Sequence, residues 1–281
     1  MAQSRVTVLT RAAARLARAG VDSPVLDAQL LLARVLGCSR LDLIAHPEQA
    51  LTAPEIERFE TLLSRRLARE PLAYILGRKE FYGLEFEVAP GVLVPRPETE
   101  VLVQECARRL RTPFPTVLDV GTGSGVIAIA LAIANPSALL YATDISPAAL
   151  EVARANAAKH GVSERVNVLR CDLVESLAGM VFDAIVSNPP YVPAGQIDSL
   201  QPEIRLHEPV EALDGGPDGL DVYRRLIPSA RALLSEGGFL AVEVGIGQAQ
   251  AVCEIARDAG YRGIVTASDL AGIDRVVVAY R

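Results

Sequence analysis

The segment Asn188-Pro189-Pro190-Tyr191 combines groups that can hold a flat amino group. Prolines stiffen the backbone and donate no N–H, so the carbonyl oxygen of Pro189 is held in a fixed direction. Asn188 adds a side-chain oxygen, and Tyr191 adds a flat aromatic face. Two acceptors in this arrangement can bind both N–H bonds of one planar –NH2 group.

Methyl transfer to an amide requires such an arrangement because the nitrogen lone pair is delocalised into the carbonyl. The barrier to amide rotation, ~18–20 kcal/mol, sets the scale of that delocalisation. Two acceptors orient the nitrogen and stabilise the positive charge that develops on it, and an aromatic face favours the same charge. Asn188, Pro189 and Tyr191 are therefore candidate catalytic residues, and Asn188, Pro189, Pro190 and Tyr191 are candidate substrate-binding residues. A proline-rich turn is the alternative for this segment taken alone.

A second candidate site is the glycine-rich stretch at 119–125, which joins an expected strand to an expected helix. Glycines let the backbone turn sharply and let a ligand approach without a Cβ in the way. Free N–H groups at the helix start favour a carboxylate or phosphate. Asp144 follows Gly121 by 23 residues, at the end of the next expected strand, where it can accept both hydroxyls of a ribose.

Two cofactor classes use this layout. Dinucleotide enzymes prefer G-x-G-x-x-G, but the third glycine here comes one position early. The D-x-G-x-G-x-G form resembles the first motif of class I S-adenosylmethionine methyltransferases, in which the loop holds the methionine part and the later acid holds the ribose. This resemblance implies that the cofactor-binding residues are Asp119, Gly121, Thr122, Gly123, Ser124, Gly125 and Asp144. A merely structural turn is the alternative.

The elements that must position these residues alternate between strand and helix from about residue 98 onwards. Strands are expected at 116–120, 138–143, 166–171, 182–187, 238–244, 263–267 and 275–280, with helices at 98–111, 124–134, 147–160, 219–235 and 247–259. Such alternation predicts an α/β fold with a mostly parallel, seven-stranded sheet. Ligands bind beyond the carboxyl ends of the strands in these sheets, and Asp119, Asp144, Asp172 and Asn188 lie at or near those ends.

Two domains joined by a linker are expected: a helical bundle at 1–77, a β-hairpin linker at 78–97 and the α/β domain at 98–281. In the first, Thr52 and Glu55 form a capping-box pattern, and Ser23-Pro24 suits a helix start. The stretch 189–218 has no expected regular structure and reads as a functional lid. Alternatively, Arg205 and Glu208 within it form a solvated surface pair.

Composition limits the function classes. The 281 residues are half hydrophobic and carry 28 basic and 34 acidic side chains, for a net charge of −6. This balance argues against a broad nucleic-acid-binding face. No apolar run approaches the ~20 residues that cross a bilayer, so a cytoplasmic protein without membrane contact is expected. The four cysteines and three histidines form no local cluster, so no metal is expected.

The whole chain resembles the HemK-type release factor glutamine methyltransferases. The matching segments are PLAYILGRKEFYG (71–83), VLVPRPETE (92–100), DVGTGSG (119–125), VSNPPY (186–191), RLHEP (205–209), ALDGGPDGLDVYRRL (212–226) and DRVVVAYR (274–281). The resemblance implies a Rossmann-like class I methyltransferase domain. It also implies that a helical domain recognises the release factor, and that the glutamine of a Gly-Gly-Gln loop is methylated with conversion of S-adenosylmethionine to S-adenosylhomocysteine.

The resemblance extends to single positions. Asn188 would meet the cofactor as well as the glutamine. Asp172 falls where such methyltransferases often contact the adenine amino group, although a solvated loop acid is an equal alternative. Leu173 falls where some members stack an aromatic on adenine, so an apolar contact is expected there. The enzyme is expected to be a monomer that does not bind nucleic acid directly.

Other activities remain open at this stage. The [DN]-P-P-[YF] pattern also resembles adenine N6 and cytosine N4 methyltransferases, because all these substrates carry –NH2 on an sp2 carbon. The adenine enzymes need a basic channel and a base brought out of the stack. A glutamine methyltransferase of a ribosomal protein would use identical chemistry. A nicotinamide-dependent oxidoreductase and a non-catalytic binding module are the remaining alternatives.

Overall fold

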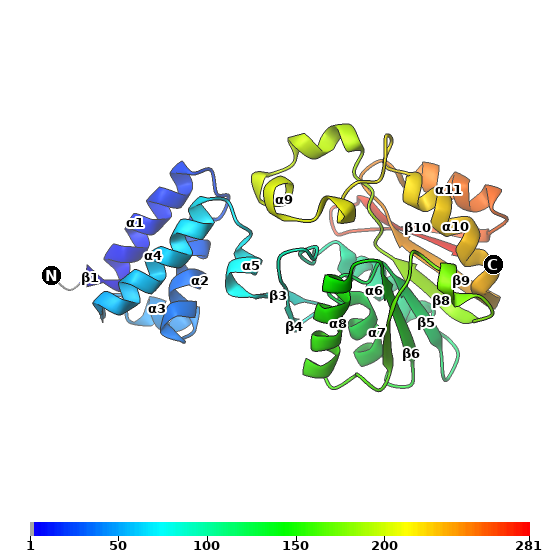
Figure 1. Cartoon of the computed structure of the whole chain (residues 1–281), viewed down its shortest axis with the longest axis horizontal. Coiled ribbons are helices and arrows are strands. Elements are labelled where there is room, and N and C mark those ends of the chain that lie inside the picture. Colours follow the sequence, from blue (N-terminus) through cyan, green and yellow to red (C-terminus); the bar gives the residue numbers. More distant parts are fainter. Residues whose placement is uncertain (1–2) are drawn as a thin grey trace. The chain divides into compact units, whose positions relative to one another are not determined.

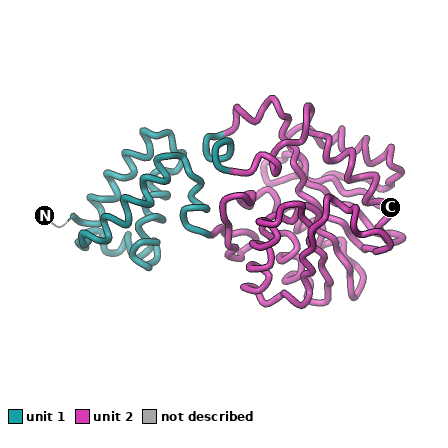
Figure 2. Tube along the Cα trace, viewed as in Figure 1, with its two compact units in different colours: residues 1–77, 201–207 teal, residues 78–200, 208–281 magenta. Residues whose placement is uncertain are grey.

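The computed structural model describes residues 3–281, which divide into two compact units (Figures 1 and 2). Unit 1 runs to Gly77 and also takes in residues 201–207. Unit 2 holds residues 78–200 and 208–281. The chain therefore passes from one unit to the other at 77/78, 200/201 and 207/208.

Unit 1 is a bundle of helices. Its elements are β1 (Gln3–Ser4), α1 (Arg5–Arg18), α2 (Pro24–Leu36), α3 (Arg40–Ala45), β2 (Ala50–Leu51), α4 (Ala53–Leu67), α5 (Leu72–Leu76) and α9 (Pro202–His207). Leu16, Leu31 and Phe59 are fully buried in its core. The capping box at the start of α4 is confirmed, since the Glu55 carboxylate accepts the Thr52 N–H at 2.7 Å. Ser23 precedes α2 but makes no side-chain cap.

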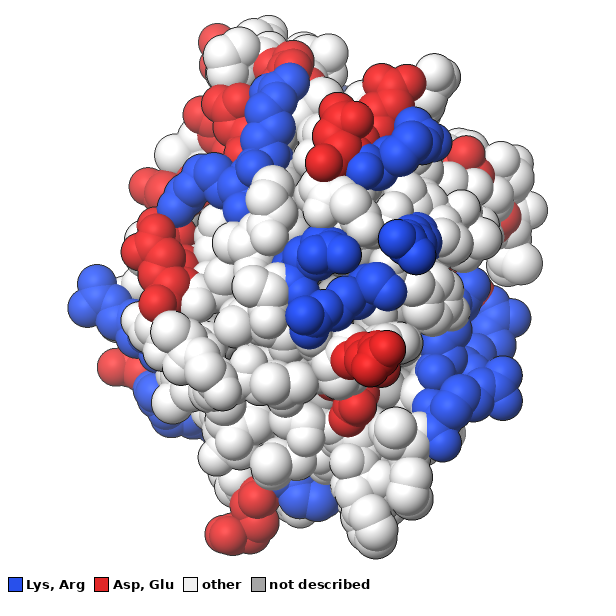
Figure 3. Space-filling view, turned by 90° about the vertical axis from the view of Figure 1, so that its right-hand side faces the viewer, with Lys and Arg blue, Asp and Glu red and all other residues white. Residues whose placement is uncertain are grey.

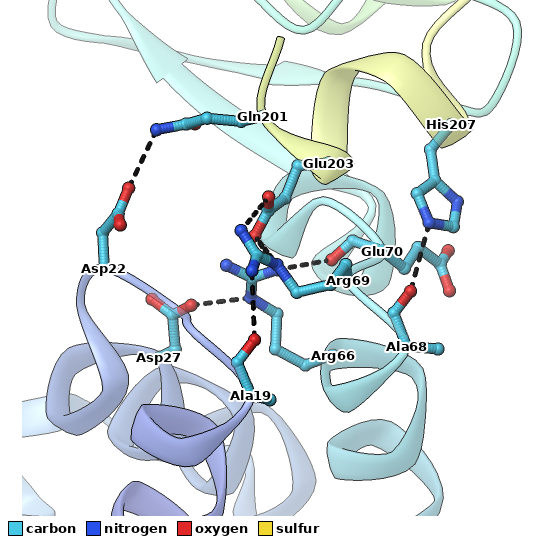
Figure 4. Close-up of polar contacts among 10 residues, drawn as sticks. All are labelled: Ala19, Asp22, Asp27, Arg66, Ala68, Arg69, Glu70, Gln201, Glu203 and His207. Carbon is cyan, nitrogen blue, oxygen red and sulfur yellow. Dashed lines mark hydrogen bonds and ion pairs between the residues drawn. The ribbon is translucent and has the colours of Figure 1, made fainter. Parts of the chain in front are cut away.

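The short helix α9 is held in unit 1 by a cluster of ion pairs (Figure 4). Glu203 accepts hydrogen bonds from Arg66 at 2.8 Å and from Arg69 at 2.7 and 2.5 Å. Arg66 also pairs with the buried Asp27 at 2.7 Å. Gln201 donates to Asp22 at 3.0 Å. The sequence predicted no regular structure at 189–218, but the structure forms short helices here: η2 (Ala194–Ser199), α9 and η3 (Val210–Ala212).

Unit 2 is an α/β unit. Its remaining elements are β3 (Arg78–Phe81), β4 (Leu84–Glu87), α6 (Thr99–Arg109), β5 (Thr116–Val120), α7 (Val126–Ala134), β6 (Leu139–Asp144), α8 (Pro147–Lys159), β7 (Val166–Arg170), η1 (Glu175–Leu177), β8 (Phe182–Ser187), α10 (Asp221–Leu233), β9 (Leu234–Glu243), α11 (Ala249–Asp258), β10 (Arg262–Ser268) and β11 (Asp274–Tyr280). Strands β3 and β4 form an antiparallel hairpin. The seven strands β10-β11-β9-β8-β5-β6-β7 form one sheet, in which β10, β11 and β9 pair antiparallel and the others pair parallel. The predicted fold class is confirmed.

Alternation of side chains along the buried strands produces one core on each face of this sheet. Val117 and Val186 pack with α6 and α7 on one face. Leu118 and Ile185, their neighbours in sequence, pack with α10 and α11 on the other. Figure 1 shows helices covering the sheet on both sides. Strand β10 lies at an edge of the sheet, and its pairing with β11 shifts register at two points.

Candidate active site

The carboxyl ends of the parallel strands meet at one edge of the sheet. Val120, the last residue of β5, pairs with Thr143 on one side and Ser187 on the other. Ser187 also pairs with Val242 of β9. The buried Ser187 hydroxyl donates to the Val120 carbonyl at 2.7 Å. The glycine loop and the Asn188 segment, which follow Val120 and Ser187 directly, therefore begin side by side.

The Asn188 amide has a defined orientation. Its Nδ2 donates to the hydroxyl of Thr99, at the start of α6, at 3.0 Å. Among the described residues, no hydrogen bond uses the Asn188 Oδ1 or the carbonyl oxygen of the buried Pro189. Neither oxygen therefore has an internal partner among the described residues that would compete with a ligand. Pro190 follows in a half-buried position.

Tyr191 is held at both its side chain and its backbone. Its hydroxyl donates to Glu243 Oε1 at 3.3 Å, and burial raises its pKa, so the proton stays on the phenol. Gln248 Nε2 donates to the Tyr191 carbonyl at 2.9 Å. A Cβ at Gly245 would lie 3.1 Å from the Tyr191 ring, so the glycine makes room for the ring.

The three loop glycines have two different roles. Gly121 and Gly123 have positive φ angles of 70° and 56°, and a Cβ at Gly121 would meet no atom within 4 Å. The backbone at Gly121 therefore borders open space that a ligand can enter, whereas a Cβ at Gly123 would lie 3.9 Å from Val92. Gly125 also has a positive φ, 84°, but a Cβ there would lie 3.0 Å from Ile129 and 3.2 Å from Ala153 of α8. Gly125 thus allows α8 to approach closely.

Asp119 lies beneath this loop and is fully buried. Its Oδ2 accepts from the Thr122 hydroxyl at 2.7 Å and from the Ala128 N–H at 3.2 Å, while its Oδ1 has no partner among the described residues. Burial raises the pKa of Asp119 to about 7. A buried carboxylate oxygen without a partner fits a ligand that brings a positively charged amino group.

Asp144, at the end of β6, accepts hydrogen bonds from backbone N–H groups in and near the glycine loop. The half-buried Asp144 accepts the Gly123 N–H at 2.9 Å and the Ser146 N–H at 2.9 Å. Each carboxylate oxygen has a second lone pair for a ligand hydroxyl. Thr122 and Ser124 are buried, and the Ser124 carbonyl accepts from Asn156 at 2.9 Å.

The two adenine candidates lie after β7. Asp172 pairs with Arg225 of α10 at 2.8 Å. Leu173 is half-buried and has a positive φ of 48°, which is uncommon for a residue other than glycine. Its carbonyl accepts from the Thr143 hydroxyl at 3.4 Å.

The sequence pattern did not mark Thr99 or Glu243, and the surface-pair alternative for Arg205 and Glu208 is wrong. Glu208 does not form a solvated pair with Arg205: it is buried, accepts from Arg96 at 2.7 Å and from the Val94 N–H at 3.2 Å, and so ties the segment before α6 to the segment after α9. Glu243 ends β9 and directly follows the apolar run at 239–242. An isolated acid at such a strand end is the signal that could have marked it.

No helix among residues 3–281 is long and apolar enough to pass through a bilayer. Nor do the described residues include a group of three or more His, Cys, Asp or Glu side chains placed to hold a metal ion.

Comparison with known proteins identifies the family. Residues 7–77 match the PrmC N-terminal domain, and residues 97–203 match the methyltransferase small domain. The release factor glutamine methyltransferase of Moorella thermoacetica is 47% identical over 275 residues, 97% of each chain. The protein of the same name from Geobacter sulfurreducens is 46% identical and covers 93% of this chain and 91% of its own. This chain belongs to the release factor glutamine methyltransferase family.

Solved structures agree with the family's fold but are more distant. The hMettl16 catalytic domain in complex with a MAT2A 3′UTR hairpin has a TM-score of 0.58 at 14% identity and covers 83% of this chain and 84% of its own. The T. thermophilus 16S rRNA N2 G1207 methyltransferase, in complex with AdoMet and guanosine, has a TM-score of 0.54 at 20% identity and covers 73% and 49%. At these identities the likeness concerns the fold alone. The predicted membership of the release factor glutamine methyltransferases is confirmed by the relatives.

Proposed function

We propose that this enzyme methylates the N5 side-chain amide of the glutamine in the Gly-Gly-Gln loop of peptide chain release factors, with S-adenosylmethionine as donor and S-adenosylhomocysteine as product. One observation carries the proposal: the Asn188 side-chain oxygen and the Pro189 carbonyl are both free of partners among the described residues and lie beside the glycine loop.

The residues of the loop fit this cofactor. Gly121 borders open space for the methionine part, and the free Oδ1 of Asp119 can accept its ammonium group directly or through water. Asp144 takes the ribose hydroxyls, while Asp172 and Leu173 are assigned to the adenine. When bound, S-adenosylmethionine supplies an electrophilic methyl carbon attached to a positively charged sulfur.

The chain's own residues prepare the nucleophile. Asn188 Oδ1 and the Pro189 carbonyl accept the two N–H bonds of the glutamine amide and hold its nitrogen in line with the methyl group. As the N–C bond forms and the S–C bond breaks, these oxygens stabilise the positive charge on the nitrogen, and the Tyr191 ring favours it from the side. The protonated amide that results is strongly acidic, so its proton leaves to solvent without a matched general base.

Other substrates that carry –NH2 on an sp2 carbon could undergo the same chemistry, and the experiment described below distinguishes them. A ribosomal protein glutamine would satisfy the same acceptors. An adenine would need a basic surface, but the face in Figure 3 carries Lys and Arg side chains beside Asp and Glu side chains, unlike a continuous basic stripe. We further propose a cytoplasmic monomer that uses no metal and binds no nucleic acid directly.

Mass spectrometry of candidate substrates tests the function. A release factor, a ribosomal protein mixture and an oligonucleotide are each incubated with enzyme and S-adenosylmethionine. We expect one added methyl group, located by fragmentation on the release factor glutamine. Asn188→Ala should nearly abolish this product while cofactor affinity changes modestly. Preferred methylation of either other substrate, or an active Asn188→Ala enzyme, contradicts the proposal.

A further inference from the structure

A buried carboxyl group in unit 2 is connected to both ends of the Asn188–Tyr191 segment. Asn188 Nδ2 donates to the Thr99 hydroxyl at 3.0 Å, and that hydroxyl is close enough to the Glu243 carboxyl to lower its pKa by hydrogen bonding. The Tyr191 hydroxyl donates to the same carboxyl, at Oε1. Thr99 and Glu243 are 2% and 1% exposed, so water does not compete for these contacts.

The chain of contacts from Glu243 through Thr99 to Asn188 is called the relay. The donors and acceptors in the relay leave one orientation for the Asn188 amide. An ionised carboxylate only accepts hydrogen bonds, a hydroxyl has one proton to donate, and an amide has a donor end and an acceptor end. Glu243 Oε2 is buried without a hydrogen-bond partner among the described residues, and the Thr99 hydroxyl is a donor whose hydrogen bonding lowers the Glu243 pKa. The Thr99 oxygen must then accept, and only the –NH2 end of Asn188 can face it. The oxygen end of Asn188 is left facing the other way.

Tyr223 and Tyr191 hold the carboxyl in place. The Tyr223 hydroxyl donates to the Glu243 backbone carbonyl at 2.7 Å, which fixes the end of β9. The hydroxyl of Tyr191 supplies the carboxyl with a donor that keeps its proton. The relay therefore links β9, α6 and the Asn188 segment, three parts of the chain that are remote in sequence.

We propose that Glu243 is a positioning residue: acting through Thr99, it turns the side-chain oxygen of Asn188, and not its –NH2 group, toward the substrate amide. The inference rests on the proposed function. With the amide reversed, an N–H donor of Asn188 would face the N–H donors of the glutamine, and one of the two acceptors for the nucleophile would be lost.

Protonation of Glu243 would remove this control. Burial raises the pKa of Glu243 to about 7, and the negative charge of Glu98 raises this pKa further. Hydrogen bonds from Thr99 and Tyr191 and the positive charge of Arg275 lower it. Tyr223, the other titratable neighbour, stays protonated because burial raises its pKa well above the ordinary value. A protonated carboxyl can donate to Thr99, which can then donate to the Asn188 oxygen. The orientation of Asn188 should therefore be lost as the pH falls below about 7.

The kinetic test uses full-length enzyme and release factor. Thr99→Val keeps the side-chain shape but removes the hydroxyl, and we expect kcat to fall at least tenfold while the dissociation constant of S-adenosylmethionine stays within about twofold. Thr99→Ser should recover most of the lost kcat. Thr116→Val is the matched control. Thr116 begins β5, at the end remote from the glycine loop, and this variant should keep the wild-type kcat. Wild-type kcat in Thr99→Val, or no recovery in Thr99→Ser, overturns the proposal.

A measurement without substrate separates this proposal from the proposed function. The side-chain 15N–1H signals of Asn188 are assigned by their loss in Asn188→Asp. In the wild type we expect them to shift with a midpoint near pH 7, and in Glu243→Gln and Thr99→Val we expect no such midpoint. A pH-independent wild-type signal overturns the relay even if methyl transfer is observed. A titrating signal with no release factor methylation would instead leave the relay standing and reject the function.

Discussion

Glu203 Oε2 lies 2.5 Å from Arg69 Nη2, although 134 residues separate the two in the chain. The pair belongs to unit 1 and fixes α9, which follows the Asn188 segment in sequence, on the helical bundle. Burial alone would raise the pKa of Glu203, but hydrogen bonds from Arg69 and Arg66 outweigh it and lower the pKa to about 2.

Glu203→Gln should therefore destabilise the protein by about 1–3 kcal/mol at neutral pH, because two arginines lose a charged acceptor. A lowered carboxyl pKa stabilises the folded chain above the ordinary value of 4.5, and this contribution is lost as the pH falls toward 2. The free energy of unfolding of the two proteins should converge in that interval. Glu211→Gln, at an exposed position, is the control and should match the wild type throughout.

Gly121→Ala and Gly125→Ala form a matched pair of loop substitutions. Both require alanine at a positive φ, which costs about 1–2 kcal/mol. Only the Cβ added by Gly125→Ala also meets Ile129 and Ala153, which adds about 1–3 kcal/mol of overpacking. Urea unfolding should therefore show the larger loss for Gly125→Ala, whereas cofactor titration should show a specific loss of affinity for Gly121→Ala. Equal stability losses would contradict the packing role of Gly125.

Asp119→Asn should fold, because the amide oxygen can replace Oδ2 as acceptor for Thr122 and Ala128. The –NH2 group would then replace the free Oδ1, so the affinity for S-adenosylmethionine should fall about tenfold or more, equivalent to about 1.4 kcal/mol. Isothermal titration calorimetry measures this loss. Undiminished affinity would remove Asp119 from the cofactor site.

The same substitution has a pH signature in the cofactor-free protein. The Asp119 pKa is raised from 3.8 to about 7, so the folded chain holds this proton more tightly than the unfolded chain does. The stabilising effect is present at low pH and is lost as the pH rises through 7. Asp119→Asn should therefore gain stability relative to the wild type between about pH 4 and pH 7. A constant difference in the urea midpoints would argue against the raised pKa.

Asp144→Ala should weaken cofactor binding first, by about tenfold to a hundredfold, since hydrogen bonds to a charged group contribute about 1.5–3 kcal/mol. Part of the loss would come from the Gly123 N–H, which Asp144 holds at 2.9 Å. Calorimetry with Asp258→Ala as an exposed control measures the change. Unchanged affinity would reject the ribose assignment.

The positions of Asp144 and Asn188 could be predicted from sequence because periodicity locates strands, and parallel strands end at one edge of a sheet. The same reasoning could not reveal Thr99 beside Asn188. That contact depends on how α6 packs against β8 and β9, which no local pattern encodes. The surface-pair alternative for Glu208 was wrong for the same reason. Its spacing from Arg205 suggests a local pair, but Glu208 pairs with Arg96.

The different surroundings of the loop glycines could not be predicted from the sequence either. Gly121 and Gly125 are equivalent letters in a motif, and both have positive φ angles. Only the approach of Ala153 distinguishes the glycine that contacts a helix from the glycine that faces open space.

The two register shifts of β10 bear on self-association. An edge strand offers free N–H and C=O groups, and a straight edge can recruit a strand from another molecule. The shifts at Arg262/Val265 and Ala267/Ser268 interrupt the regular spacing of those groups, and bulges of this kind also bend the strand. Strand β10 therefore offers a less regular edge for pairing with a further strand than a straight strand would.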